Sequence, residues 1–474
     1  MGFSSNIFIY AFLPLCVISY FFIKWLIKDK DFKVRNGILI FFSLFFYLFG
    51  SGRYILILIS VVCISYFSGV LISKYKKHAK LISVLAILLN LGLLIFFKYF
   101  NFLYSSISSL ANDHFHVSLA ALPKVFLPIG ISFYVFQSVS YIADVASGKV
   151  RVQKNFFKLL LYISFFPQLI AGPIVRYSDK EYEITKRSEN IDSFYHGFCR
   201  FIIGLSEKVL IADVLGESVD KIYGAGFDQL TQLLAISAAV MYSLEILFDF
   251  SGYSNMAIGI AEMFGFNFKE NFDRPYTSQN VTEFWRRWHM SLSGWLKDYV
   301  YIPLGGNRKG VLRTYLNLSI VFLICGIWHG ANWTFLIWGI YHGILLIIER
   351  ILKNKCKFQL KSVYGTAITF IFVTFGWIIF RSSNLKSFIS FISTMLGITK
   401  PTGFLYYDYK YYVNNQVIVV AIFSLILSFL PTDRIKEFLK KHVILNSILM
   451  VVLLILCMIF MSGASFNAFI YFKF

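Results

Sequence analysis

Two histidines of this sequence lie in apolar surroundings, where ionisable side chains are rare. His329 lies in residues 314–348, a stretch in which the only other acidic or basic residue is His342. His289 ends a run rich in tryptophan and arginine. Burial disfavours the charged form of an imidazole, so a deep histidine stays neutral and can accept a proton from a hydroxyl group. This chemistry suits acyl transfer, in which an alcohol attacks a thioester. The alternative for His329 is that its ring only hydrogen-bonds to a neighbouring helix.

A second polar cluster interrupts the apolar run at residues 244–255. Glu245 and Asp249 are four residues apart and share one helix face, and Tyr253 and Asn255 follow. Ionisable groups within a membrane mark functional sites by default. The alternative is that these groups satisfy one another and cap a broken helix.

Asn280, with Glu283 three residues later, predicts the start of a helix. A continuous helix from there would place Trp285 and His289 on one apolar face. The alternative is an interfacial helix whose arginines touch lipid phosphate. The next loop contains Gly305, Gly306, Asn307 and Arg308. Its backbone N–H groups and Arg308 could bind phosphate groups.

The amino-acid composition indicates the class of protein in which these residues lie. Of 474 residues, 57% are hydrophobic and 15% are charged, which excludes an ordinary soluble domain. The abundance of Phe, Ile and Leu excludes a disordered chain. We therefore predict an all-α, polytopic membrane protein that forms one domain over residues 1–474. The net charge of +20 comes from short clusters between apolar runs, so we expect contact with membrane lipid and no nucleic acid. The six cysteines have no ligand spacing, and we expect no metal.

Several uncharged runs approach the length of about 20 residues that a membrane span needs. The candidates are residues 1–23, 36–52, 54–73, 81–97, 125–143, 157–175, 230–248, 366–380, 416–430 and 443–462. Residues 314–348 are long enough to cross twice. They fit a hairpin that dips from the cytoplasmic side, with His329 near its tip.

Basic loops predict the orientation. Residues 24–35, 74–80, 149–158, 286–313, 350–361 and 434–441 are rich in Lys and Arg, so we place them in the cytoplasm. The span at 443–462 then delivers the tail, residues 463–474, to the outside. We expect a cell-membrane protein with both termini extracytoplasmic.

Six motifs together resemble the membrane-bound O-acyltransferase family. They are residues 167–173 (PQLIAGP), 249–259 (DFSGYSNMAIG), 273–276 (DRPY), 283–289 (EFWRRWH), 295–308 (WLKDYVYIPLGGNR) and 326–333 (GIWHGANW). The PLGGNR element is similar to the branch that O-acetylates bacterial alginate and peptidoglycan.

This resemblance implies a helical fold with re-entrant helices and a tunnel through a thinned membrane. His329 matches the catalytic histidine of the family and His289 its second histidine. The resemblance also implies a cytoplasmic thioester donor, acetyl-CoA, whose CoA part we expect near Gly305, Gly306, Asn307 and Arg308. We expect the tunnel to be lined or supported by Asp249, Tyr253, Asn255, Trp285, Trp328 and Asn332.

The last six residues, 469–474 (FIYFKF), resemble an aromatic hexapeptide of such envelope acyltransferases or of their small partner. There the tyrosine carries the acyl group outside, which makes Tyr471 the expected acyl acceptor. His329 would act as base, and His289 would polarise or orient the thioester carbonyl. An extracytoplasmic serine-type O-acetyltransferase would then pass the acetyl group to a cell-envelope polysaccharide. The alternative for the tail is an aromatic interfacial anchor.

Two other functions stay open at this point. One is D-alanyl transfer to teichoic acid, which would use a carrier-protein thioester. The other is a transporter or flippase in which Glu245 and Asp249 form a proton relay.

Overall fold

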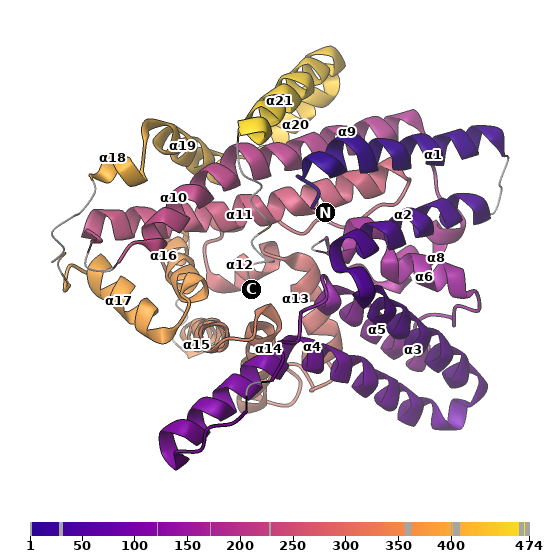
Figure 1. Cartoon of the computed structure of the whole chain (residues 1–474), viewed down its shortest axis with the longest axis horizontal. Coiled ribbons are helices and arrows are strands. Elements are labelled where there is room, and N and C mark those ends of the chain that lie inside the picture. Colours follow the sequence, from indigo (N-terminus) through magenta and orange to yellow (C-terminus); the bar gives the residue numbers. More distant parts are fainter. Residues whose placement is uncertain are drawn as a thin grey trace. The chain divides into compact units, whose positions relative to one another are not determined.

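The computed structural model describes residues 2–27, 32–120, 122–170, 172–226, 229–355, 362–399, 401, 408–463 and 469. Every regular element in this part of the chain is a helix (Figure 1), as predicted. The chain divides into two compact units, Met1–Gly197 with Ile260–Lys269, and Phe198–Gly259 with Glu270–Phe474. The single-domain interpretation stays a prediction.

Eight helical segments of the described residues are long and apolar enough to cross a membrane. They are Phe8–Leu26, Lys33–Lys74, Lys76–Phe115, Gln232–Met263, Val311–His329, Trp333–Lys355, Ser362–Arg381 and Val443–Gly463. The segment Lys33–Lys74 would extend about 63 Å as one helix, twice the thickness of a bilayer core. It turns at Gly52, where φ is +53°, into the two predicted spans. The chain is a multi-pass membrane protein.

The first unit holds the N-terminal helices. These are η1 (Phe8–Phe12), α1 (Leu13–Leu26), α2 (Lys33–Ser51), η2 (Gly52–Tyr54), α3 (Ile55–Lys74), η3 (Lys76–His78), α4 (Ala79–Phe115), α5 (Ile131–Ala146), α6 (Phe156–Ser164), α7 (Phe166–Leu169), α8 (Tyr177–Thr185) and the first residues of α9 (Ile191–Ser206). Helices α3, α4 and α5 pack against one another (Figure 1). The predicted span at 157–175 is wrong. The chain leaves the helix at Phe165, and α7 restarts with Pro167 in its first turn, where a missing N–H group costs little.

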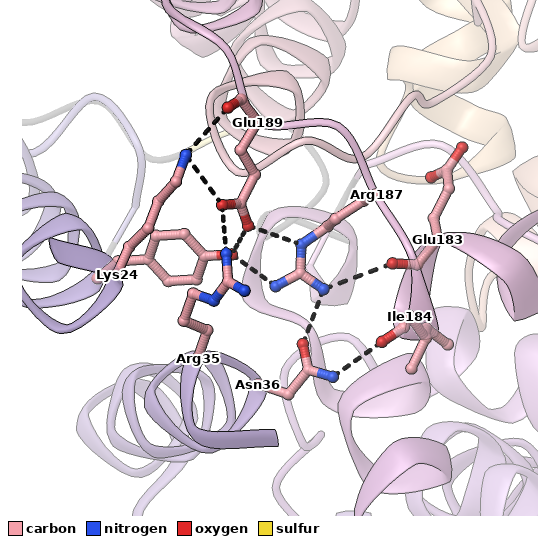
Figure 2. Close-up of polar contacts among 8 residues, drawn as sticks. Lys24, Arg35, Asn36, Glu183, Ile184, Arg187 and Glu189 are labelled. Carbon is pink, nitrogen blue, oxygen red and sulfur yellow. Dashed lines mark hydrogen bonds and ion pairs between the residues drawn. The ribbon is translucent and has the colours of Figure 1, made fainter. Parts of the chain in front are cut away.

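One carboxylate in the first unit is surrounded by three cations (Figure 2). Glu189 lies between α8 and α9. Its oxygens are 2.7 Å from Arg35, 3.2 Å from Lys24 and 3.3 Å from Nε of Arg187. Arg187 also donates to Asn36 Oδ1 at 2.8 Å, and Tyr20 donates to Glu189. We call these six residues the Glu189 cluster. It joins the end of α1 and the start of α2 to the segment between α8 and α9.

The second unit holds the remaining helices. After the rest of α9 these are η4 (Glu207–Ala212), α10 (Asp213–Gly224), α11 (Gln232–Met263, whose last residues belong to the first unit), η5 (Pro275–Thr277), α12 (Val281–Arg287), α13 (Met290–Leu296), η6 (Lys297–Tyr301), α14 (Val311–His329), α15 (Trp333–Lys355), α16 (Ser362–Arg381), α17 (Leu385–Met395), α18 (Tyr409–Tyr412), α19 (Asn415–Phe429), α20 (Asp433–Lys441) and α21 (Val443–Gly463). Helix α11 runs through the polar residues 245–255 without a break, so the alternative of a broken helix there is wrong.

The predicted hairpin is formed by α14 and α15, which lie side by side. Glycines bring the two backbones together. A Cβ atom on Gly326 would lie 2.3 Å from the carbonyl oxygen of Phe335 and 3.2 Å from Cα of Gly339. A Cβ atom on Gly339 would lie 2.3 Å from the carbonyl oxygen of Phe322. Because no side chain fits in these gaps, glycine is required at both positions.

Candidate active site

His329 is the last residue of α14 and stands at the tip of the hairpin, as predicted. The chain then turns away through Gly330, which is extended. A Cβ atom on Gly330 would lie 2.2 Å from the Phe335 ring, so the turn packs tightly. The His329 side chain is buried. Its ring centroid lies 4.9 Å from that of Trp338 and 5.2 Å from that of Phe380.

His289 occupies a break between two short helices, α12 and α13. The prediction of one continuous helix from Asn280 through His289 is therefore wrong. His289 adopts left-handed backbone angles, with φ of 42°, which a residue with a side chain rarely adopts. The predicted start of α12 is confirmed, because the Asn280 side chain accepts a hydrogen bond from the Glu283 backbone N–H at 2.8 Å.

The His289 ring is fully buried among aromatic side chains. Its centroid lies 4.7 Å from Phe250 on α11 and 6.3 Å from Phe272. Its Nδ1 lies 3.1 Å from Oδ1 of the buried Asn271. Burial lowers the pKa of His289 to about 3, so the imidazole is neutral at physiological pH.

Trp328 lies between the two histidines. Its ring centroid is 5.9 Å from that of His289 and 5.1 Å from that of His329. The structure thus brings together the two histidines and one of the predicted supporting residues, although they come from α14 and from the α12–α13 junction. With these aromatic neighbours, both imidazole rings are buried.

Trp285 lies in a second aromatic layer. Its Nε1 donates to Nδ1 of His342 at 3.4 Å, and its ring centroid lies 5.6 Å from that of Trp338. Trp338 in turn lies 4.9 Å from both His329 and His342. His342 is fully buried in this layer.

The three predicted supporting residues of α11 have different neighbours. Asp249 pairs with Lys208 of η4 at 2.7 Å. Burial alone would lower the pKa of Lys208, but Asp249 and Asp213 outweigh it and raise the pKa above its ordinary value. Asn255 accepts from Arg200 at 3.0 Å and donates to Glu207 at 2.9 Å. Asp249 and Asn255 therefore hold α11 against the α9–η4 helix.

Tyr253 contacts the C-terminal tail. The Phe469 ring is buried, 4.6 Å from the Tyr253 centroid and 5.6 Å from that of Phe250. Phe250 is the ring that packs on His289. Tyr471, the predicted acyl acceptor, lies outside the described residues.

The remaining predicted residues hydrogen-bond to, or are bonded by, other segments of the second unit. Asn332 accepts from the Thr334 backbone N–H at 3.2 Å and donates to the Ser383 carbonyl at 2.8 Å, so it orders the hairpin tip. The loop with Gly305, Gly306, Asn307 and Arg308 is held by Asn317, which donates to the Gly306 carbonyl at 2.8 Å. From Asn317 to His329, α14 rises about 18 Å.

Sequence reasoning missed three residues around the histidines. Asn271 bonds His289 from 18 positions earlier in the chain. Phe250 and Trp338 form walls of the site. Phe250 lies inside a quoted motif, so the motif itself could have pointed to it. Nothing in the sequence around Asn271 or Trp338 indicates that these residues contact the histidines. In the described part of the chain, no group of three or more His, Cys, Asp or Glu side chains is placed to hold a metal ion.

The sequence that forms this site is similar to those of known membrane-bound acyltransferases. The sequence model of the membrane-bound O-acyltransferase family matches residues 42–389. The probable alginate O-acetylase AlgI of Pseudomonas putida is 39% identical over 388 residues, which are 81% of this chain and 78% of the relative. The peptidoglycan O-acetyltransferase of Helicobacter pylori is 36% identical over 431 residues, 84% of this chain and 80% of the relative. The teichoic acid D-alanyltransferase of Bacillus subtilis is 30% identical over 273 residues, 53% of this chain and 68% of the relative. The chain belongs to the membrane-bound O-acyltransferase family, and it is a membrane-bound acyltransferase.

Proposed function

We propose that this protein transfers an acetyl group from cytoplasmic acetyl-CoA, across the cell membrane, toward a cell-envelope polysaccharide. The acetyl group is carried outside on Tyr471. A separate extracytoplasmic serine-type O-acetyltransferase then passes it to the polymer. In this arrangement both chain termini are extracytoplasmic.

The observation that carries this proposal is the buried position of Phe469 beside the candidate site. Phe469 packs on Tyr253 and Phe250, and Phe250 packs on His289. Two residues of extended chain span at most about 7 Å. A tail anchored at Phe469 can therefore bring a tyrosine two positions further on into the neighbourhood of His289. An interfacial anchor would instead leave this ring among lipid headgroups, so its burial supports the shuttle.

The chemistry assigned to the site is the attack of a phenol on a thioester. His329 takes the proton from the Tyr471 hydroxyl as its oxygen bonds to the acetyl carbon and the carbon–sulfur bond breaks. His329 then returns the proton to the thiolate of CoA, which leaves as the thiol. His289 orients the reacting groups. The aromatic rings around both imidazoles exclude the water that would hydrolyse the acetyl ester.

The donor would approach from the loop at 305–308, at the cytoplasmic end of α14. Arg308 is exposed there and is free to meet the phosphate groups of CoA. The pantetheine arm would have to extend along α14 to reach His329. We prefer acetyl over D-alanyl transfer because the O-acetylating relatives match more of this chain, at higher identity, than the D-alanyltransferase does. Family membership likewise favours an enzyme over a transporter.

The test is acetyl transfer in purified protein and in cells. Purified protein is mixed with labelled acetyl-CoA, and the acetylated tail peptide is measured by mass spectrometry. We expect Tyr471→Phe to abolish tail labelling and polymer acetylation. The matched control is Tyr364→Phe, which changes a tyrosine that is 81% exposed on α16. Wild-type polymer acetylation in the Tyr471→Phe strain would remove the shuttle and leave direct transfer.

The role of His329 is tested in the same assay. His329→Ala should abolish tail acetylation while the protein stays in the membrane, because the hydroxyl proton then has no acceptor. The matched control, His78→Ala, removes an exposed imidazole and should retain wild-type acetylation. Labelling by a D-alanyl carrier-protein thioester, with none from acetyl-CoA, would favour the D-alanyl alternative.

A further inference from the structure

We propose that Asn271 is a positioning residue that holds His289 in the tautomer protonated at Nδ1, so that Nε2 accepts a hydrogen bond from the hydroxyl group of the acyl acceptor. This inference rests on the proposed function only for the identity of the group that Nε2 meets. The tautomer itself follows from the contacts around Asn271.

The orientation of the Asn271 amide is fixed by a backbone donor. Oδ1 of Asn271 lies 3.1 Å from the backbone nitrogen of Ser291 and accepts its hydrogen. A backbone N–H group can only donate. Rotating the amide by 180° would place the Asn271 NH₂ group against this N–H, donor against donor. The Ser291 hydroxyl also donates to Oδ1, at 2.9 Å. The Asn271 backbone adds a further restraint, because its carbonyl accepts from the Met290 N–H at 2.9 Å.

This fixed oxygen determines where His289 carries its proton. Nδ1 of His289 lies 3.1 Å from Oδ1 of Asn271 and 3.4 Å from the hydroxyl oxygen of Ser291, whose own hydrogen is donated to Oδ1. Since Oδ1 can only accept, Nδ1 must be the donor and must hold the proton. A neutral imidazole has one ring proton, so Nε2 is left with a bare lone pair. Among the described residues, Nε2 of His289 is buried and has no hydrogen-bond partner.

The bare lone pair of Nε2 determines which chemical group His289 can bind. A thioester carbonyl oxygen is an acceptor, and it gains nothing from a second acceptor. A hydroxyl group, in contrast, donates its hydrogen to Nε2 when the acceptor binds. Rotation about the phenol C–O bond then turns the same hydrogen toward His329, which takes it as the oxygen bonds to the acyl carbon. His289 would therefore orient the attacking alcohol rather than polarise the thioester. The left-handed backbone at His289 and the ring contacts with Phe250 and Trp328 hold the imidazole in this direction.

The experiment compares Asn271→Asp with Asn271→Leu in the full-length protein. An aspartate oxygen still accepts from Nδ1 and from the Ser291 N–H, so Asn271→Asp should keep the tautomer and most of the transfer rate. Leucine has no acceptor, and Asn271→Leu should lower the rate about 10- to 100-fold, by analogy with the loss caused by replacing a residue that orients a metal-bound histidine. Asn90→Leu is the matched control, because it also removes a buried amide but lies in α4. Its rate should equal that of the wild type.

Nitrogen NMR of protein with ¹⁵N-labelled histidine reads the tautomer without any substrate. The His289 signals are assigned by their absence in His289→Gln. We expect an unprotonated Nε2 in the wild type and in Asn271→Asp, and a mixture of tautomers in Asn271→Leu. A proton on Nε2 of the wild type, or an unchanged rate in folded Asn271→Leu, would overturn the proposal. If Asn271→Leu does not fold, the wild-type spectrum and the rate of Asn271→Asp still decide. Absence of acetyl transfer in the wild type, with the expected spectrum, would refute the proposed function and not the tautomer.

Discussion

Replacing Glu189 by Gln removes the carboxylate on which the three cations of the Glu189 cluster converge, while nearly preserving the side-chain shape. The side chains of Arg35, Arg187 and Glu189 are 9%, 0% and 2% exposed. Loss of one partner from a buried ion pair costs about 3–5 kcal/mol, because the other charge stays buried without compensation. Lys24 is 36% exposed, so it remains hydrated and adds little to this cost.

The two arginines share one carboxylate, so their losses do not add. The Phe32 ring lies 3.9 Å from the Arg35 guanidinium and 4.4 Å from that of Arg187, but it carries no charge to replace that of Glu189. We therefore expect Glu189→Gln to lower the free energy of unfolding of the first unit by about 3–5 kcal/mol. For a unit of about 200 residues, this corresponds to a fall in Tm of about 6–20 °C.

The assay must report on unfolding of the first unit. Tryptophan fluorescence does not suit this purpose, because most tryptophans lie in the second unit. Cys16 is suitable, because it is a buried residue of α1, one helical turn before Tyr20. We would replace the other five cysteines by Ala in a common background and follow the reaction of Cys16 with a thiol-specific dye during heating.

Asp179→Asn is the matched control. It removes a carboxylate of the same unit whose partner, Lys269, is 74% exposed, and it should cost no more than about 1 kcal/mol. If Glu189→Gln exposes Cys16 at the same temperature as Asp179→Asn, the cluster does not stabilise the fold by charge pairing.

Two further predictions concern the candidate site. Gly326→Ala should push α15 away from α14, because the new Cβ meets a backbone oxygen at 2.3 Å. It should cost about 1–3 kcal/mol or more in detergent melting, whereas Gly343→Ala, whose Cβ would meet a side-chain atom at 3.4 Å, should melt like the wild type. Acid should destabilise the protein through His289. The pKa of His289 is about 3 in the folded chain and 6.5 ordinarily. Between pH 6.5 and pH 3 the unfolded chain therefore binds a proton that the folded chain does not, so the free energy of unfolding falls as the pH is lowered. His289→Gln should flatten this part of the plot of Tm against pH, and parallel plots would contradict the reasoning.

The hairpin of α14 and α15 could be predicted from the sequence because its signals are local. A long stretch with few charged residues, flanked by basic residues, indicated two crossings from one side. The structure adds that Gly326 and Gly339 lie in contact where the two helices approach each other. The position of His329 at the tip followed from counting residues.

The partners of the α11 carboxylates could not be predicted, because they come from another helix. Sequence spacing paired Glu245 with Asp249, and it suggested a break in the helix as one way to satisfy them. In the structure Asp249 pairs with Lys208, which the π-helical turn η4 carries. Glu207 of the same turn accepts from Asn255 and from Ser251. The helix therefore remains intact, because side chains from another segment satisfy its polar groups.

His289 shows most directly what a sequence pattern cannot predict. Two helices of seven residues each carry the same periodic apolar positions as one helix of sixteen, so periodicity alone cannot reveal the break between them. The break is held by Asn271, which bonds Met290 and Ser291 through its backbone and side chain. The same side chain bonds the histidine ring. A motif can thus locate a candidate histidine, yet in our proposal the atom that this histidine presents to a substrate depends on a residue outside the motif. For that reason, a substitution at Asn271 should change what His289 can do while every motif residue stays in place.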